Sequence, residues 1–267
     1  MGISINTVTN GGFTMRYIRF GTGARSFVII PGLSVKSVLG SADAVVKQYQ
    51  PMTDKYTVWL FDRRENVPES YSVRDMVSDT AEAMKILGIA DADVFGASQG
   101  GMIAMVIAIE YPELVHKLVL GSSSANLRDH KSTTLQRWIC LAREGDRVGL
   151  CLDFGRELYP KEFFEQYEEA FAVLGKSVTD EELKRFIILA EGAGGFYIAD
   201  ELSRIKCPVL AIGASDDRVL PPGSSEEIIA SIGNRPDCKY YIYDNYGHAA
   251  FDMAPDYKDR MMVFLCS

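Results

Sequence analysis

The stretch Gly96-Ala97-Ser98-Gln99-Gly100-Gly101 decides the fold, because it places a serine between glycines at a predicted turn from strand to helix. The apolar run Ala92–Phe95 before it predicts a buried strand, and the run Met102–Ile109 after it predicts a buried helix. A serine on such a sharp turn has a strained backbone, and small residues two positions before and after it keep the strand and helix backbones apart. The pattern predicts a nucleophile at Ser98. Two alternatives are a helix-capping serine in a glycine-rich turn and a phosphate-binding loop, although the sequence lacks GxGxxG and a lysine after the glycines.

Further short apolar runs on both sides of this turn predict the rest of a sheet. They are Phe27–Ile30, Thr57–Phe61, Lys117–Leu120, Val209–Ile212 and Tyr240–Tyr243. Several are continuously apolar, as strands buried on both faces are, and helical patterns alternate with them. One helix is predicted to begin at Ser72, where Asp75 completes a capping box, and to stop at Gly88. The sequence therefore predicts the α/β class, with a mostly parallel central sheet flanked by helices.

The alternation of strands and helices stops between about Asn126 and Ala199. Only helical patterns are found there, one opened by Pro160 and the next by a capping box from Thr179 to Glu182. A pair of ordinary crossover helices is the alternative, but the segment is long for one. We expect a helical cap at residues 126–199, inserted into one core that is formed by residues 1–125 and 200–267.

A serine hydroxyl becomes a good nucleophile only when a neighbouring base accepts its proton, and the chain has three histidines. His248 lies just beyond the last predicted strand, and loops at the carboxyl ends of parallel strands converge on one edge of a sheet. His116 and His130 are expected at the surface. His248 is therefore the predicted base for Ser98.

A carboxylate must orient that histidine, and two neighbouring aspartates are candidates. Asp216 and Asp217 both follow the predicted strand Val209–Ile212, again at a carboxyl end. Whichever does not contact the histidine could cap the following helix or pair with Arg218. The residues alone leave this choice open.

At this point the chain resembles the α/β-hydrolase superfamily, nearly from end to end, and most of all its bacterial capped esterase-like and carbon–carbon-bond hydrolases. The order serine, aspartate, histidine is the one expected of that architecture. The other matching segments are Ile29–Leu33, Phe61–Arg64, Tyr111–Leu120, Asp217–Pro221, Gly247-His248 and Pro255. Two positions depart from the family pattern, since Pro31-Gly32 replaces a frequent His-Gly and Glu65 replaces a usual glycine.

The resemblance implies the remaining members of the site. In the family the acid stands four residues before a proline, which selects Asp217, with Pro221, over Asp216. Two backbone N–H groups form the family's oxyanion hole, and their counterparts here are those of Leu33 and Gln99. A serine nucleophile, rather than an aspartate, argues against the dehalogenase and epoxide-hydrolase branches.

We therefore predict a cofactor-free serine hydrolase that cleaves a small or medium carboxylic ester through an acyl-enzyme. Thioester or carbon–carbon-bond hydrolysis on the same scaffold is one alternative. A ligand-binding receptor on a hydrolase fold, from a different class, is another. The aromatic residues of the cap, Trp138 and those of Phe163–Phe171, are expected mainly to pack the cap.

Composition excludes several partners. The 28 basic and 36 acidic residues give a net charge of −8 without a basic cluster, which argues against nucleic acid and anionic membranes. The five cysteines have no CxxC spacing, no HExxH motif occurs and the dinucleotide fingerprint is missing, so neither a metal nor a nucleotide cofactor is expected. Met1–Gly12 shows no signal-peptide pattern, and Met102–Ile109 is too short to span a bilayer. We expect a cytoplasmic monomer or homodimer with reduced thiols and a small-molecule substrate.

Overall fold

A single mixed sheet forms the centre of the molecule. The computed structural model describes residues 4–128, 132–233 and 235–267. Its eight strands lie in the order β1-β2-β4-β3-β5-β6-β7-β8, and all neighbours from β4 to β8 are parallel. The six predicted strands are confirmed as β3 (Arg25–Ile30), β4 (Tyr56–Phe61), β5 (Ala92–Ala97), β6 (Val115–Gly121), β7 (Val209–Ala214) and β8 (Cys238–Tyr243). The predicted α/β class with a mostly parallel sheet is therefore correct.

The sheet begins with a hairpin that the sequence analysis did not predict. Strands β1 (Ile5–Asn10) and β2 (Phe13–Phe20) pair antiparallel, and β2 joins β4 in the same sense. Only one face of this hairpin is buried, so polar and apolar residues alternate along it and no continuous apolar run marks it. The turn at Gly11-Gly12 and the alternation after Phe13 were the available signals.

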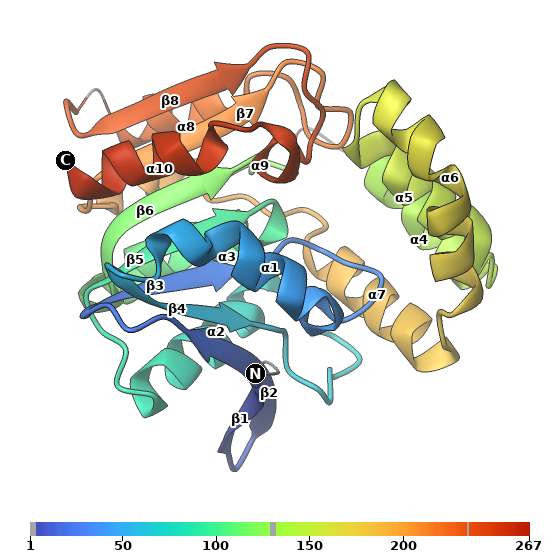
Figure 1. Cartoon of the computed structure of the whole chain (residues 1–267), viewed down its shortest axis with the longest axis horizontal. Helices are drawn as coiled ribbons and strands as arrows, with labels where there is room; N and C mark the ends of the chain where they lie inside the picture. The colour runs from blue at the N-terminus through green and yellow to red at the C-terminus, as the bar shows by residue number, and fades with distance from the viewer. Residues whose placement is uncertain (1–3, 129–131, 234) are drawn as a thin grey trace.

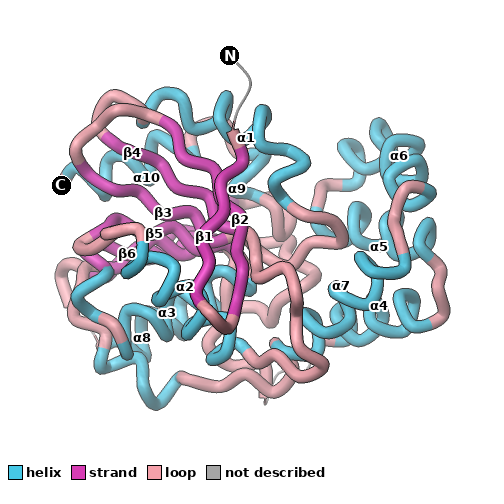
Figure 2. The backbone as a smooth tube through the Cα atoms, turned by 90° about the horizontal axis from the view of Figure 1, so that it is seen from below, coloured by secondary structure: helices cyan, strands magenta, loops and turns pink. Residues whose placement is uncertain are grey.

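Helices cover both faces of the sheet (Figures 1 and 2). The core on one face includes residues of α2 (Val73–Ile86), α3 (Gln99–Glu110) and α8 (Ser224–Ile232). The core on the other includes residues of α1 (Ala42–Tyr49), α9 (Ala250–Met253) and α10 (Tyr257–Cys266). The short 3-10 helices are Val38–Ser41, Gln50–Met52, Pro112–Leu114 and Ala199–Arg204.

Local signals define the ends of α2 as predicted. The Ser72 side chain accepts from the Asp75 N–H while the Asp75 carboxylate accepts from the Ser72 N–H, which completes the capping box. Gly88, just after the helix, has a φ of 69°, a left-handed conformation that favours glycine. These caps fix the helix between β4 and β5 and thereby the position of the turn at Ser98.

In the described part of the chain between β6 and β7 lie four α-helices, α4 (Thr133–Arg143), α5 (Arg147–Leu158), α6 (Lys161–Lys176) and α7 (Asp180–Gly192). We call them the helical insertion. In Figure 1 they lie beyond the arrowheads of the strands, at the carboxyl-end edge of the sheet. They have a core of their own that includes Trp138, Leu150 and Phe186, together with Val35 and Val219 from the loops of the sheet. The insertion is thus packed onto the edge where the predicted site residues converge.

A buried ion pair also ties the insertion to the sheet. Arg185 of α7 donates from Nη2 to Oδ1 of Asp62 at 2.9 Å, and the Asp62 side chain is only 5% exposed. The Ser37 hydroxyl donates to the other oxygen, Oδ2, at 2.6 Å. Asp62 therefore connects α7 to the loop that follows β3.

Candidate active site

Ser98 lies on the turn between β5 and α3, half-buried at the carboxyl-end edge of the sheet. Its backbone has φ 51° and ψ −120°, a strained combination for a residue other than glycine. The Ser98 N–H donates to the Gly121 carbonyl at 2.8 Å, and the Ser123 hydroxyl donates to the Ser98 carbonyl at 2.9 Å. Strand β6 therefore holds the turn in this conformation.

The glycines around Ser98 permit the close approach that the turn requires. A Cβ atom added at Gly100 would lie 2.0 Å from the Ile30 carbonyl oxygen, and one at Gly96 would lie 2.5 Å from the Gly100 oxygen. No real Cβ atom tolerates such contacts with rigid backbone. A larger residue at either position would push α3 away from the sheet.

Gly100→Ala is accordingly expected to lower the free energy of unfolding by at least about 2 kcal/mol, because the added methyl group overlaps backbone that cannot move. Gly40→Ala is the matched control, since a Cβ there meets nothing within 4 Å. It should change stability by less than about 0.5 kcal/mol. Urea unfolding of both variants measures the difference, and equal stability would show that the helix can retreat freely.

His248 and Asp217 form a buried pair at the same edge. His248 follows β8 and precedes α9, and its Nδ1 lies 2.8 Å from Oδ2 of Asp217 in the loop after β7. The two side chains are only 4% and 11% exposed. The other Asp217 oxygen, Oδ1, accepts the N–H groups of Val219 and Leu220 at 2.8 and 3.0 Å. These contacts fix the orientation of the carboxylate.

The pKa of Asp217 lies below its ordinary value. Burial alone would raise this pKa, but the interaction with His248 and the hydrogen bonds from Leu220 and Val219 stabilise the carboxylate more strongly. Asp217 is therefore ionised at neutral pH. An ionised carboxylate at Nδ1 of a histidine leaves Nε2 free to accept a proton.

Asp216 occupies a different environment from its neighbour. It is exposed, its Oδ1 accepts a hydrogen bond from the Ser215 hydroxyl at 2.8 Å, and its own N–H donates to the Tyr246 carbonyl. The structure thus brings Asp217, and not Asp216, to His248.

His116 lies away from this pair. His116 is half-buried in β6 near the start of that strand, and its Nδ1 lies 3.2 Å from Oδ1 of Asp91. His130 lies outside the described residues.

The predicted oxyanion donors belong to the two segments that meet at Ser98. Gln99 is the first residue of α3, and N–H groups in the first turn of a helix have no partner within it. Leu33 lies in the loop after β3, directly after Gly32, where a Cβ atom would be 3.1 Å from the Ser98 Cβ. The loop and the turn are therefore in contact, and both Leu33 and Gln99 line one cavity with Ser98 and His248.

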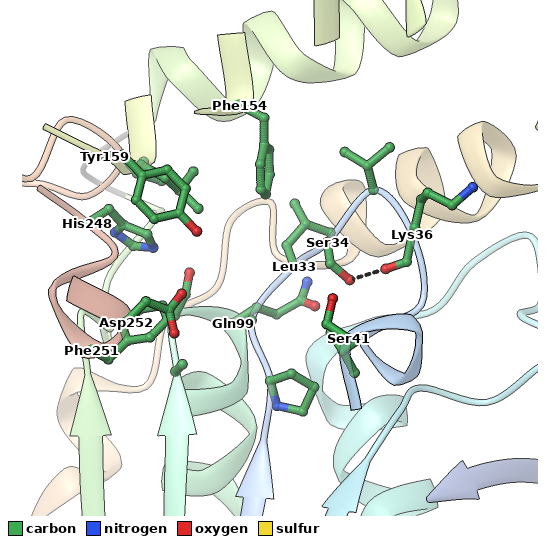
Figure 3. Close-up of a pocket in the computed structure, with 18 of the residues that line it drawn as sticks. Leu33, Ser34, Lys36, Ser41, Gln99, Phe154, Tyr159, His248, Phe251 and Asp252 are labelled. Carbon is green, nitrogen blue, oxygen red and sulfur yellow. Dashed lines mark hydrogen bonds between the residues drawn. The ribbon is translucent and has the colours of Figure 1, made fainter. Parts of the chain in front are cut away.

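That cavity has a volume of about 950 Å³ and is lined by residues of the sheet edge and of the helical insertion. Figure 3 shows His248 and Tyr159 on one side and Leu33, Ser34 and Lys36 on the other. Its walls are mainly apolar, and those from the insertion include Trp138, Phe154, Leu158, Phe163, Phe171 and Leu174. The aromatic side chains thus line the cavity as well as packing against one another.

Sequence reasoning missed several side chains around the site. Gln99 was selected for its N–H, but its side-chain Nε2 also donates to the Leu189 carbonyl of α7 at 2.6 Å. Arg63 donates from Nη2 to the Pro31 carbonyl at 2.6 Å and so supports the loop that carries Leu33. Asp252 lines the cavity four residues after His248. In the sequence, only the positions of Gln99, Arg63 and Asp252 within or close to the family motifs indicated that they lie near the site.

No group of three or more His, Cys, Asp or Glu side chains among the described residues is arranged to hold a metal ion. None of the helices in the described ranges has the length and apolar character needed to cross a membrane.

Comparison with known proteins decides the family. The model of the alpha/beta hydrolase fold family matches residues 27–255. The chain belongs to this family. The resemblance inferred from the sequence motifs is therefore confirmed, and the departures at Pro31 and Glu65 are variations within it.

Relatives of this alpha/beta hydrolase cover most of its length. A protein of Escherichia coli O81 (strain ED1a), named "Putative carbamate hydrolase RutD", is 26% identical over 248 residues, which are 88% of this chain and 89% of the relative. Among solved structures, MGS-M2, an alpha/beta hydrolase enzyme from a Medee basin deep-sea metagenome library, has a TM-score of 0.86 at 22% identity and covers 98% of both chains. The esterase EaEST from Exiguobacterium antarcticum has a TM-score of 0.80 at 20% identity and covers 100% of both. These structural likenesses concern the fold.

Proposed function

We propose that this protein is a serine hydrolase that cleaves small or medium carboxylic esters with Ser98, His248 and Asp217. The observation that carries the proposal is the buried contact of 2.8 Å between His248 Nδ1 and Asp217 Oδ2, at a cavity that Ser98 also lines. An oriented histidine and a serine on a strained turn are the parts that nucleophilic acyl transfer needs.

In this mechanism Ser98 Oγ attacks the ester carbonyl carbon while His248 Nε2 accepts its proton. The tetrahedral intermediate collapses, the alcohol leaves with the proton from His248, and the acyl group stays on Ser98. A water molecule then attacks the acyl-enzyme, gives its proton to His248, and the carboxylic acid is released as Ser98 regains its proton. Asp217 keeps the imidazole in the required tautomer and stabilises its protonated form.

The N–H groups of Leu33 and Gln99 would receive the negative charge that develops on the carbonyl oxygen. Preorganised donors of this kind contribute about 10²–10³ in rate. Arg63 would act as a positioning residue for the Leu33 N–H, because its hydrogen bond to the Pro31 carbonyl holds the loop that carries Leu33. The side chain of Gln99 is held by its hydrogen bond to the Leu189 carbonyl of α7.

The helical insertion would serve as a cap domain, with residues 126–199 covering a core made of residues 1–125 and 200–267. Two observations support this division. The isolated β-bridge between Asn126 and Tyr197 joins the two ends of the insertion. The aromatic residues of the insertion form one wall of the cavity. The mainly apolar lining favours an ester with a hydrocarbon acyl or alcohol part.

A carbamate is the second candidate substrate, because the E. coli relative is named a putative carbamate hydrolase. The same acyl transfer would act on its carbonyl group. A panel of p-nitrophenyl esters, carbamates, thioesters and diketones compares these substrates and the carbon–carbon-bond alternative directly. We expect the highest kcat/KM for an ester.

A fluorophosphonate probe tests the nucleophile. We expect covalent labelling of the folded protein and recovery of the label on the peptide that contains Ser98, because only an activated serine reacts. Heat-unfolded protein is the control and should remain unlabelled. Failure of the folded protein to react would favour the ligand-binding receptor on a hydrolase fold.

A further inference from the structure

A carboxylate lies in the wall of the cavity close to the proposed base. Asp252 belongs to α9, four residues after His248, and the two side chains line the same cavity. Figure 3 shows them on the same side of it, opposite Lys36 and Ser41. Asp252 keeps solvent-accessible surface, whereas His248 is almost fully buried. The carboxylate is therefore available to a bound molecule, and the mechanism proposed above does not use it.

Two neutral polar side chains lie near Asp252. The Tyr159 hydroxyl and the Gln48 side chain interact with its carboxylate, and both residues line the cavity. The protein around the cavity raises the pKa of Asp252 through desolvation, while Lys258 and these two neighbours act in the opposite direction. Asp252 thus forms a polar patch with Tyr159 and Gln48 in a mainly apolar lining, across the cavity from Ser34, Lys36 and Ser41.

The nearby cation is committed to other contacts. Lys258 donates to the Phe251 carbonyl, and its Nζ lies over the Tyr49 ring at 5.1 Å and over the Tyr257 ring at 5.3 Å. Burial raises the pKa of Asp252 and lowers that of Lys258 to about 8, and both shifts favour the neutral forms. A second cation at Asp252 would therefore meet little net negative charge. The oxygens of Asp252 can nevertheless accept hydrogen bonds from a neutral donor.

A hydrogen-bond acceptor in an apolar wall discriminates between substrates. A ligand with a methyl group at that point would strip water from the carboxylate and return no hydrogen bond. A ligand with a hydroxyl group there would replace the lost water. Sites built in this way reject an analogue that lacks the donor more strongly than apolar pockets reject an extra methylene.

We propose that Asp252 is a specificity-determining residue that accepts a hydrogen bond from a neutral hydroxyl group of the substrate, and that the preferred substrates are hydroxylated esters. The proposal rests on the proposed function, since it concerns the same cavity and the same reaction.

Matched pairs of esters test it. On the acyl side, p-nitrophenyl 6-hydroxyhexanoate is compared with p-nitrophenyl heptanoate, in which a methyl group replaces the hydroxyl. On the alcohol side, 6-hydroxyhexyl acetate is compared with heptyl acetate. For each pair we take the kcat/KM of the hydroxyl ester divided by that of the methyl ester. We expect this ratio to be about 30-fold lower in Asp252→Leu than in wild type for one of the two pairs, the one whose hydroxyl group reaches residue 252. Because each ratio is taken within one protein, a general loss of activity cancels.

Two further variants keep the test independent of folding defects. Asp252→Asn has nearly the same shape and keeps one acceptor oxygen, so its ratio should lie between those of wild type and Asp252→Leu. Asp259→Leu removes an exposed carboxylate of α10 and should leave every ratio unchanged.

The outcomes separate this inference from the proposed function. If wild type cleaves the esters and Asp252→Leu shows the same ratios in both pairs, Asp252 does not select substrates. If 6-aminohexanoate esters are preferred to the hydroxyl esters, the site binds a cation, and the proposal of a neutral hydroxyl donor is wrong. If no ester is cleaved and the fluorophosphonate does not label Ser98, the proposed function fails and the substrate class fails with it.

Discussion

Ser98→Ala is expected to lower the turnover of a p-nitrophenyl ester by roughly 10⁴-fold or more, while the protein remains folded. Without Oγ no acyl-enzyme forms, and only water held in the cavity can attack the carbonyl. The turn itself should persist, because the Ser98 N–H and carbonyl carry its hydrogen bonds to Gly121 and Ser123. Steady-state kinetics of the purified variant, with circular dichroism to verify folding, measure the effect.

Ser34→Ala supplies the matched control. Ser34 lines the same cavity, but its hydroxyl donates to the Lys36 carbonyl at 2.7 Å within its own loop (Figure 3). Its loss should change kcat by no more than about 10-fold, because that hydroxyl orients a loop and attacks nothing. An active Ser98→Ala enzyme, or equal losses in the two variants, would refute the assignment of the nucleophile.

His248→Gln should be nearly as inactive as Ser98→Ala, and the double variant should be little worse than either. Residues that act as one unit in a reaction are not additive, since the second loss removes a function already gone. Additive losses would indicate that Ser98 and His248 act separately.

The sequence predicted those parts of the fold whose signals are local. Strands β3 to β7 contain short apolar runs because both faces of the parallel sheet are covered, whereas the edge strand β8 is only partly buried. Helix α2 is bounded by a capping box and a left-handed glycine. The hairpin β1–β2 is buried on one face only, so its signal is a weaker alternation of polar and apolar residues. A local pattern therefore predicts an element well where burial is complete.

The site was predictable to the extent that it lies at strand ends and in motifs. Ser98 directly follows β5, His248 lies in the loop after β8, and parallel strands bring such ends to one edge. The contacts of Gln99 with Leu189 and of Arg185 with Asp62 join segments 90 and 123 residues apart. The spacing of residues along the sequence does not predict such contacts, because they depend on how the helical insertion packs against the sheet.

The choice between Asp216 and Asp217 gives the second large effect. Asp217→Asn is expected to lower kcat by about 10³- to 10⁴-fold. An asparagine can present its N–H₂ group to His248, which then has its proton on Nε2 and cannot accept one from Ser98. The amide would also remove the negative charge that stabilises the protonated imidazole. KM for a short ester should change little, because Asp217 contacts the histidine and two backbone N–H groups.

Asp216→Asn makes the same chemical change one residue earlier and should leave kcat within about 3-fold of wild type. Asp216 is exposed and accepts a hydrogen bond from Ser215, which an asparagine oxygen can also accept. The pair of variants thus separates the effect of position from the effect of charge, because overall charge changes equally in both. If Asp216→Asn lost activity and Asp217→Asn kept it, the buried contact with His248 would be structural, and the order of the catalytic residues would have to be assigned again.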